Sequence, residues 1–359
     1  MEAMYMTAVF VATVVLVILR ILTIQFGKGP VNWPVVGMMP WLLWNMSNIY
    51  ENGAKVVIAN GGTFKFRGPW WCSSHLFQVV TSTPANLEHI LKNDFANFPR
   101  GPYFKGAFFD IFGHGLFTAD GELWKHQRKA MAIILSSTAS RDRNFSLLQN
   151  LVHEKLLPLL EEAKEQKTVV DLQNILLQFT LDNICLTVFG RDTGSPNTAA
   201  RFASAFDEAI QCCTYRLVFP PFLWKLMRFL NVGFEKKLRT AEAIVREYIS
   251  ERVKCRVREV EEEKQVQGDI LSSFIRLEAE EGRSPSEKML QDLTLSIFLA
   301  SRDTSALAIS WFFWILSMHP NVEEIIASEL TNILKSKHLR ISEKTSYDEK
   351  KLFGWEELR

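Results

Sequence analysis

Cysteine is scarce in this sequence and is not arranged for binding or cross-linking. The 359 residues contain five cysteines, and no two of them are spaced as Cys-x-x-Cys. Disulfide frameworks and structural zinc sites both use closely spaced sets of cysteines. Neither is therefore indicated, no metal site is predicted from these cysteines, and a reducing, cytosolic setting fits the main body best.

An excess of charge of either sign is also missing. The chain has 41 Lys and Arg against 40 Asp and Glu, which gives a net charge of +1, and 47% of its residues are hydrophobic. Proteins that bind nucleic acid through bulk charge have a clear basic excess. We therefore exclude nucleic acid as a partner and expect a globular protein with a large core and an additional apolar segment.

Charge is absent from the N-terminal stretch between Ala3 and Leu19, and the apolar character resumes after Arg20 as far as Ile24. This is about the length of one membrane span. Arg20 and Lys28 follow the apolar run and no cleavage site is evident, which favours an uncleaved anchor over a removed signal peptide. The positive-inside rule then predicts a single-pass protein whose body faces the cytosol. We assign residues 1–27 to this membrane anchor.

The rest of the chain is predicted to be mainly α-helical with a small β-sheet. Residues 28–45 are rich in proline and predict a helix-free hinge, and residues 46–359 form the folded body. Alternating residues predict a strand pair at 63–67 and 76–81. The stretch 101–115 is rich in Gly and Phe and is expected to be irregular, 171–188 is expected to be a core helix, and 234–264 to be a solvated helix.

One long helix, at about residues 285–318, organises the body. Ser284 and Glu287 match a capping box with Pro285 between them, and His319-Pro320 ends the helix. Between Leu293 and Met318 the only formal charges are Arg302 and Asp303. Consecutive helical residues point about 100° apart, so we do not expect these two charges simply to face one another. A charged break in a buried helix needs another explanation.

A second candidate site lies on the helix predicted to follow Asp120. Trp124 and Arg128 are four residues apart and share one face, where they offer an indole donor beside a guanidinium. The simpler interpretation, which residue statistics favour, is a surface cation stacked on an aromatic ring. His126 is expected to be exposed to solvent.

These features occur in an order that resembles a membrane-anchored cytochrome P450, a haem-thiolate monooxygenase. The matching stretches are the N-terminal anchor with its Pro-rich hinge, Trp124-x-x-x-Arg128, Ala300-Ser301-Arg302-Asp303-Thr304-Ser305, and His319-Pro320-Asn321-Val322. The surrounding sequence, notably 32–38 and 95–129, is similar to the plant fatty-acid and alkane hydroxylases of that family. The resemblance covers essentially all of Val31 to Arg359.

The resemblance implies a role for each of these residues. Trp124 and Arg128 would donate to a haem propionate, Ala300 would lie against the haem face, and Asp303 with Thr304 would deliver protons during oxygen activation. Physically, a hydroxyl beside a carboxylate in an apolar helix can relay protons while excluding bulk water. Alternatively, the Thr304 hydroxyl could simply bond the carbonyl one turn back.

The resemblance also implies the reaction and its partners. The parent activity would be hydroxylation of a long-chain fatty acid, of the omega-hydroxylase type, or of an alkane. It would use dioxygen and electrons from NADPH delivered by cytochrome P450 reductase. The protein would reside in the endoplasmic reticulum membrane.

Two departures from the family pattern stand out. Ser301 replaces the usual glycine, which could narrow the oxygen groove or perturb a local kink. The Phe-x-x-Gly-x-Arg-x-Cys-x-Gly loop, which supplies the iron ligand, and the earlier Glu-x-x-Arg motif are both missing from these residues. Cys72 is the remaining candidate ligand by exposure, but its setting does not suit the role. We therefore expect an incomplete catalytic domain that is inactive as this fragment.

Two other interpretations remain open. The chain could be a non-catalytic interaction protein with two membrane spans, at 4–24 and 293–318, whose central charges form an intramembrane site. It could also be a truncated decoy or the product of an incomplete gene record.

Overall fold

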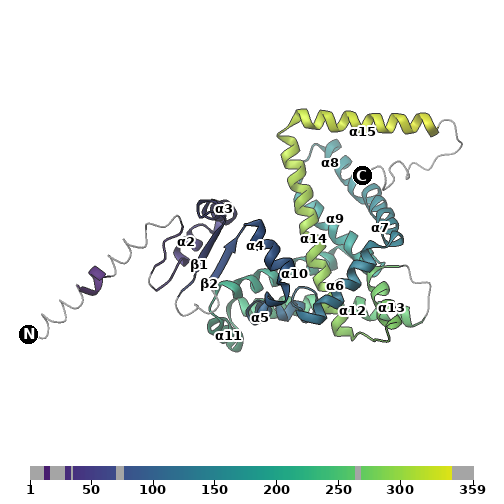
Figure 1. Cartoon of the computed structure of the whole chain (residues 1–359). Coiled ribbons are helices and arrows are strands. Elements are labelled where there is room, and N and C mark those ends of the chain that lie inside the picture. The colour runs from purple at the N-terminus through teal and green to yellow at the C-terminus, as the bar shows by residue number, and fades with distance from the viewer. Residues whose placement is uncertain (1–11, 17–28, 34, 70–76, 263–267, 342–359) are drawn as a thin grey trace, which may run out of the picture. The chain divides into compact units, whose positions relative to one another are not determined.

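The computed structural model describes residues 12–16, 29–33, 35–69, 77–262 and 268–341, and it is mainly helical. The described part contains one antiparallel pair of strands and forms two compact units (Figure 1). Unit 1 comprises Met1–Phe104 with Arg216–Leu226, and unit 2 comprises Lys105–Tyr215 with Met227–Arg359. The prediction of a mainly α fold with a small sheet is confirmed. The predicted anchor at 1–27 lies outside the described residues except for 12–16, which are helical.

Unit 1 contains the sheet and the short helices around it. Strand β1 (Thr63–Arg67) pairs with β2 (Phe77–Thr81), with Thr63 opposite Thr81 and Arg67 opposite Phe77. The predicted strand pair is therefore confirmed. The helices are α2 (Met39–Trp44), α3 (Ile49–Ala59) and α4 (Pro84–Glu88), with a π-helical turn at His89–Asn93 and 3-10 turns at Met46–Asn48 and Phe95–Asn97.

The proline-rich hinge is not free of helix, because α2 begins within it. Pro40 lies in the first turn of α2, where a missing amide proton costs nothing. Just before α2, Gly37 has φ +61° and approaches the sheet so closely that an added Cβ would lie 2.3 Å from the carbonyl oxygen of Gly68. The amide of Met38 then donates to the carbonyl of Arg67 at 2.7 Å. A glycine is needed at this contact, which fastens the segment to β1.

Unit 2 is built from helices. Their bounds are α5 (Gly101–Phe112), α6 (Gly121–Ser136), α7 (Thr138–Leu151), α8 (Leu157–Gln166), α9 (Leu172–Phe189), α10 (Pro196–Val218), α11 (Pro221–Leu230), α12 (Gly233–Glu261), α13 (Ile270–Glu280), α14 (Glu287–Ser317) and α15 (Pro320–Ile341), with a π-helical turn at Val152–Leu156. Parts of α5, α10 and α11 belong to unit 1. Helix α9 was predicted correctly: Asp171 caps its first turn and Gly190, at φ +67°, ends it.

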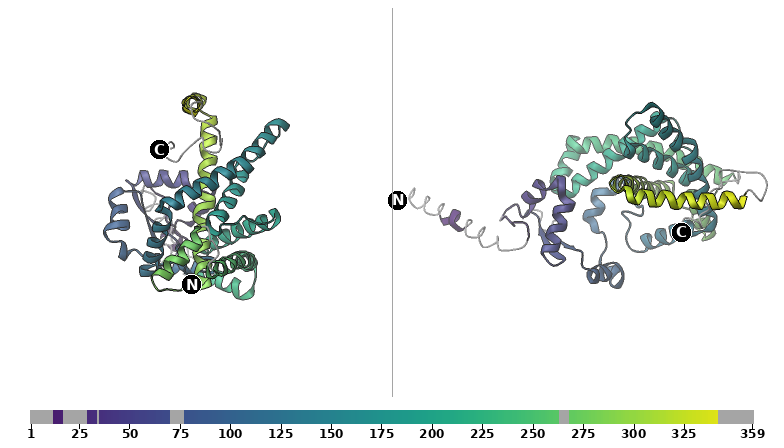
Figure 2. Two further views of the ribbon diagram at one scale, coloured as in Figure 1. Left: turned by 90° about the vertical axis from the view of Figure 1, so that its right-hand side faces the viewer. Right: turned by 90° about the horizontal axis from the view of Figure 1, so that it is seen from above.

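The long central helix is present as α14, which packs along α9 and α12 (Figure 1). Its start was predicted incorrectly. The helix begins at Glu287, and Ser286 rather than Ser284 caps it by accepting from the amide of Met289 at 3.2 Å. Its end was predicted correctly, since α14 stops at Ser317 and α15 begins at Pro320. Figure 2 shows α15 turning sharply away from α14.

Two segments were misjudged because a buried face was overlooked. Residues 101–112 form α5 instead of an irregular loop, and the helix buries one side at Ala107, Phe108, Ile111 and Phe112. Helix α12 was expected to be a solvated surface, yet it buries a continuous stripe at Leu238, Ala241, Val245, Ile249 and Val253. In both helices the packing of an apolar face outweighs the glycine or charge content.

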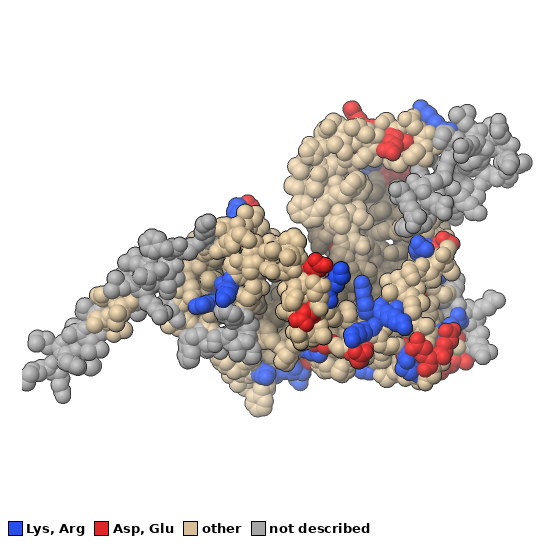
Figure 3. All heavy atoms as spheres, in the orientation of Figure 1, with Lys and Arg blue, Asp and Glu red and all other residues tan. Residues whose placement is uncertain are grey.

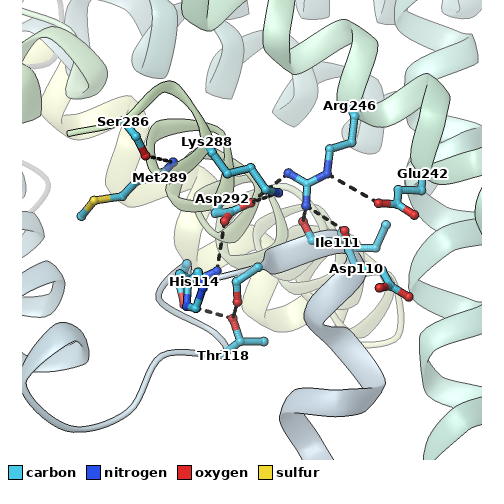
Figure 4. Close-up of polar contacts among 12 residues, drawn as sticks. Asp110, Ile111, His114, Thr118, Glu242, Arg246, Ser286, Lys288, Met289 and Asp292 are labelled. Carbon is cyan, nitrogen blue, oxygen red and sulfur yellow. Dashed lines mark hydrogen bonds and ion pairs between the residues drawn. The ribbon is translucent and has the colours of Figure 1, made fainter.

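A buried carboxylate fastens the first turns of α14 to α12 and to the segment after α5 (Figure 4). Asp292 is fully buried and accepts from the amide of His114 at 3.0 Å, from Arg246 Nη1 at 2.8 Å and from Lys288 Nζ at 2.8 Å. Arg246 Nη2 also donates to the carbonyls of Asp110, at 2.7 Å, and Ile111, at 3.1 Å, both in the last turn of α5. A buried charge is tolerated only when it is paired and hydrogen-bonded, as Asp292 is.

The segment 113–119, which follows α5, also contacts α6. Gln127 of α6 is fully buried, and its Nε2 donates to the carbonyl of His114 at 2.9 Å. Thr118 closes the turn by donating to the carbonyl of Gly113 at 2.6 Å. The 113–119 segment therefore fixes α6 relative to α14, and these are the two helices that carry the predicted site residues.

We predict that Gly115→Ala destabilises the chain. An added Cβ at Gly115 would lie 2.2 Å from the backbone oxygen of Asp292, which cannot move without distorting α14. We expect the free energy of unfolding to fall by about 1–3 kcal/mol, measured by urea denaturation. The control is Gly106→Ala within α5, where a Cβ meets no atom within 4 Å, and which should be neutral or stabilising by up to about 1 kcal/mol. Equal effects of the two changes would contradict the close approach.

Candidate functional site

The first part of the candidate site is one face of α6. Trp124 is half-buried and Arg128 is exposed. No hydrogen bond, ion pair or ring contact of Arg128 is found in the part of the chain that the structure describes, so the predicted stacking on Trp124 is not formed there. The guanidinium, a planar donor suited to carboxylates, therefore remains available to an anion.

The opposite face of α6 is held by a charged cluster formed by the end of α13 and the residues that follow it. His126 Nε2 lies 2.6 Å from Glu278 Oε1, and Glu278 Oε2 accepts from Arg283 Nε at 2.9 Å. His126 is 28% exposed, so the expectation of a solvent-exposed histidine was only partly right. Burial raises the pKa of Glu278, but hydrogen bonds from Arg283 and His126 outweigh it and leave that pKa below its usual value. Glu278 therefore stays ionised and holds α6 in place.

The second part of the site is a stripe of exposed side chains along α14. Ala300 and Thr304 are both exposed and lie one turn apart, and Leu307 and Trp311 continue the stripe. Thr304 Oγ1 donates to the carbonyl of Ala300 at 2.6 Å, which is the simpler alternative foreseen for this threonine. The hydroxyl oxygen can still accept a proton or hydrogen bond from another group.

The charged break in α14 is explained by a third partner. Arg302 is only 4% exposed, and its guanidinium holds the Asp207 carboxylate of α10 with two bonds, Nη1 to Oδ1 at 2.5 Å and Nη2 to Oδ2 at 3.2 Å. Asp303 Oδ1 also lies 3.2 Å from Arg302 Nη1. The expectation that the neighbouring charges would not face one another was therefore wrong, because the long arginine side chain turns back far enough to reach both carboxylates.

Asp303 is the group in this cluster best suited to hold and release a proton. Burial raises its pKa, the neighbouring Arg302 lowers it and the Asp207 charge raises it again, and the net result lies above the ordinary value of 3.8. Its Oδ1 is buried and accepts no hydrogen bond from any described residue. A carboxyl in these surroundings keeps its proton to a higher pH than an exposed aspartate does.

Ser301, the departure from the family pattern, does not interrupt the helix. Its hydroxyl donates to the carbonyl of Ile297 at 2.5 Å, and α14 remains α-helical from Glu287 to Ser317.

Asp207 is the residue that the sequence analysis missed. It is exposed and lies in α10 between Phe206, which is fully buried, and the half-buried Glu208, so its local sequence resembles that of an ordinary solvated helix face. The usable signal was indirect: a buried Arg302 requires a carboxylate partner, and the sequence does not say which one.

The described cysteines are poorly suited to bind iron as thiolates. Cys185, Cys212 and Cys213 are buried, and Cys255 is half-buried beside Glu259. Burial raises the pKa of Cys185 to about 12, which keeps it a thiol. Cys72 lies outside the described residues. Among described side chains, no group of three or more His, Cys, Asp or Glu residues is placed to hold a metal ion.

The distribution of charge over unit 2 and the apolar character of its helices bear on the interpretation as a protein with two membrane spans. Lys, Arg, Asp and Glu side chains gather over α6, α12 and α13, whereas the end of α14 next to α15 is largely uncharged (Figure 3). Neither α14 nor any other helix in the described ranges has the length and apolar character needed to cross a bilayer. The two-span interpretation, which places its second span at 293–318, finds no support here.

Comparison with known proteins decides the family. The sequence profile described as Cytochrome P450 matches residues 28–348. The chain belongs to the cytochrome P450 family. The resemblance stated from the motifs is therefore confirmed, and the family implies a haem cofactor.

Individual relatives refine this assignment. The chain is 39% identical to Cytochrome P450 86B1 of Arabidopsis thaliana over 97% of this chain and 63% of the relative. It is 33% identical to Noroxomaritidine synthase 1 of Narcissus pseudonarcissus, over 86% of this chain and 59% of the relative. The chain is 30% identical to Alkane hydroxylase MAH1 of Arabidopsis thaliana, over 83% of this chain and 61% of the relative. The chain thus spans about three-fifths of the length of these relatives.

We predict that Asp303→Asn stabilises this P450 chain at neutral pH. The raised pKa means that the folded state favours the neutral carboxyl over the ionised one. The stability that the neutral carboxyl contributes is fully present below pH 3.8 and is lost as the pH rises through the folded-state pKa. At pH 7 the ionised carboxylate therefore costs stability that asparagine avoids. The free energy of unfolding should increase at pH 7, and the gain should shrink as the pH approaches 4. Asp142→Asn on α7, which changes an exposed carboxylate, should show no such gain, and destabilisation at pH 7 by Asp303→Asn would contradict the assignment.

Proposed function

We propose that this chain is part of a haem-dependent monooxygenase that inserts one oxygen atom from dioxygen into a C–H bond of a long-chain fatty acid or alkane. The observation that carries the proposal is the central segment of α14. There the half-buried Asp303 has a carboxyl with a raised pKa. The next residue, Thr304, places a hydroxyl on the exposed apolar stripe of α14. Such a pair can deliver protons where water is otherwise excluded.

The described residues fit a haem. The α14 stripe begins with the small Ala300 and continues with Leu307 and Trp311, a surface suited to a flat apolar macrocycle. Arg128 presents a guanidinium that is suited to a propionate, with the Trp124 indole four residues earlier on the same helix. When bound, the haem would supply the oxygen chemistry, and these residues would hold and orient it.

The residues of this chain then have separate tasks. Asp303 takes up a proton from solvent and donates it to Thr304 Oγ1. The hydroxyl proton that Thr304 already carries then leaves the Ala300 carbonyl and is donated towards the apolar side of α14. Arg302 is held by Asp207 and supplies the local positive charge that limits how far the pKa of Asp303 rises.

Substrate and partners follow from the relatives and from the N-terminal sequence. An alkane hydroxylase is among the relatives, which supports a long-chain aliphatic substrate, with omega-hydroxylation of a fatty acid as the specific expectation. We propose that electrons come from NADPH through cytochrome P450 reductase on the endoplasmic reticulum membrane. Residues 1–27 would anchor the protein there in a single pass, with the body facing the cytosol.

We further propose that these 359 residues alone do not catalyse the reaction. The haem of this family needs a cysteine thiolate, and the described cysteines are buried or lie beside a carboxylate.

The purified chain, loaded with haem, tests this expectation. After reduction and addition of carbon monoxide, we expect no absorption band of the thiolate-ligated type, because no described cysteine can supply the ligand. A thiolate-type band would contradict the proposal, and loss of that band in Cys72→Ser would then identify Cys72 as the ligand.

Activity can be tested in a fusion of this chain to the part of Cytochrome P450 86B1 of Arabidopsis thaliana that it does not match. Replacing Asp303 by Asn and Thr304 by Ala together should lower the ratio of product formed to oxygen consumed by about 10-fold or more, because general acid–base groups contribute on that order or above. The control is Ser310→Ala, which removes a hydroxyl that bonds the carbonyl one turn back in the same helix. Unchanged coupling in the double variant would refute the relay.

A further inference from the structure

The Arg302 guanidinium lies between two carboxylates but forms hydrogen bonds with only one of them. Both of its terminal nitrogens bond Asp207 of α10, at 2.5 and 3.2 Å. Asp303 Oδ1 lies 3.2 Å from Nη1, within ion-pair distance, but accepts no hydrogen bond from any described residue. Asp207 thus takes the directional bonds and leaves Asp303 only the electrostatic attraction.

The three groups also differ in their contact with solvent. The side chain of Arg302 is 4% exposed, that of Asp303 33% and that of Asp207 53%. A buried guanidinium must keep a partner, because an unpaired buried charge costs several kcal/mol. If Asp207 withdraws or loses its charge, Asp303 is the adjacent carboxylate that can replace it, and Asp303 would then be held in the ionised form.

We infer that Asp207 is a positioning residue of the proposed site: by occupying the Arg302 guanidinium it prevents that cation from clamping Asp303, and so leaves the Asp303 carboxyl free to take up and release a proton. The inference rests on the proposed role of Asp303 as a proton relay. It assigns a function to a residue of α10, a helix that carries none of the family motifs identified in the sequence.

The electrostatic surroundings agree with this arrangement. Burial is the largest cause of the raised pKa of Asp303, Arg302 opposes it and the charge of Asp207 adds to it. Helices α9 and α12 also pack against α14, but no charged group of theirs contributes to this shift among the described residues. Asp303 is therefore controlled by one residue of its own helix and one of α10.

The experiment is a titration of the Asp303 carboxyl carbon by NMR in the purified chain, with its signal assigned by its loss in Asp303→Asn. In Asp207→Asn, which should still fold because the site is half-exposed, the midpoint should fall by about one pH unit, a tenfold weaker proton affinity. Asp207→Glu restores a carboxylate and should return the midpoint towards that of the natural sequence. Asp142→Asn removes an exposed carboxylate on α7 and should leave the midpoint unchanged.

A double-mutant cycle separates an effect through Arg302 from the direct repulsion between the two carboxylates. In an Arg302→Gln background, Asp207→Asn should shift the midpoint much less than it does in the natural sequence. An unchanged or higher midpoint in Asp207→Asn, or an equal shift in both backgrounds, would overturn the inference. The titration does not depend on turnover. A failure of the proposed monooxygenase function would appear instead in the ratio of product formed to oxygen consumed by the fusion, so the two failures can be told apart.

Discussion

The arrangement of helices α6, α12 and α14 in unit 2 depends on the hydrogen bonds that the buried carboxylate of Asp292 accepts. This carboxylate accepts from Lys288 of its own helix, from Arg246 of α12 and from the backbone amide of His114. The cost of burying a charge is offset only when all three donors are in place, which makes the arrangement close to all-or-none. Since His114 also accepts from Gln127, the position of α6 relative to α14 follows from the same carboxylate.

Helix α14 changes character along its length, and the candidate site lies at the change. Its first half is buried against α9 and α12, with Leu290, Leu293, Leu295 and Phe298 at most 1% exposed. From Leu307 onward the large side chains at 311–315 are about half exposed. The charged pair at 302 and 303 therefore lies at the boundary between a packed and an open stretch. This is where a carboxyl can keep a raised pKa and still exchange protons with solvent.

Local sequence signals predicted the elements that local physics determines. The core helix at 171–188, the alternation in 63–67 and the break at Pro320 were all predicted, because each depends on neighbouring residues. Helix α5 and the buried stripe of α12 were missed, since only their packing partners reveal which face is inside. Ser284 was predicted to cap α14, whereas Ser286, two residues later, caps it. Asp207 is 95 positions from Arg302, and no local pattern marks so distant an ion pair.

Stability alone does not account for the Arg302 cluster. Burying a guanidinium costs much of what its ion pair returns, and an apolar residue of similar size would serve a packed helix at least as well. The partner Asp207 is half exposed, which weakens the pair further, and the second carboxylate at 303 adds a cost of its own. Residues that lower stability in an otherwise apolar helix are expected where a site requires them. The three charges together make sense if Asp303 must change its protonation state, because that requires a cation nearby whose hold on it is kept incomplete.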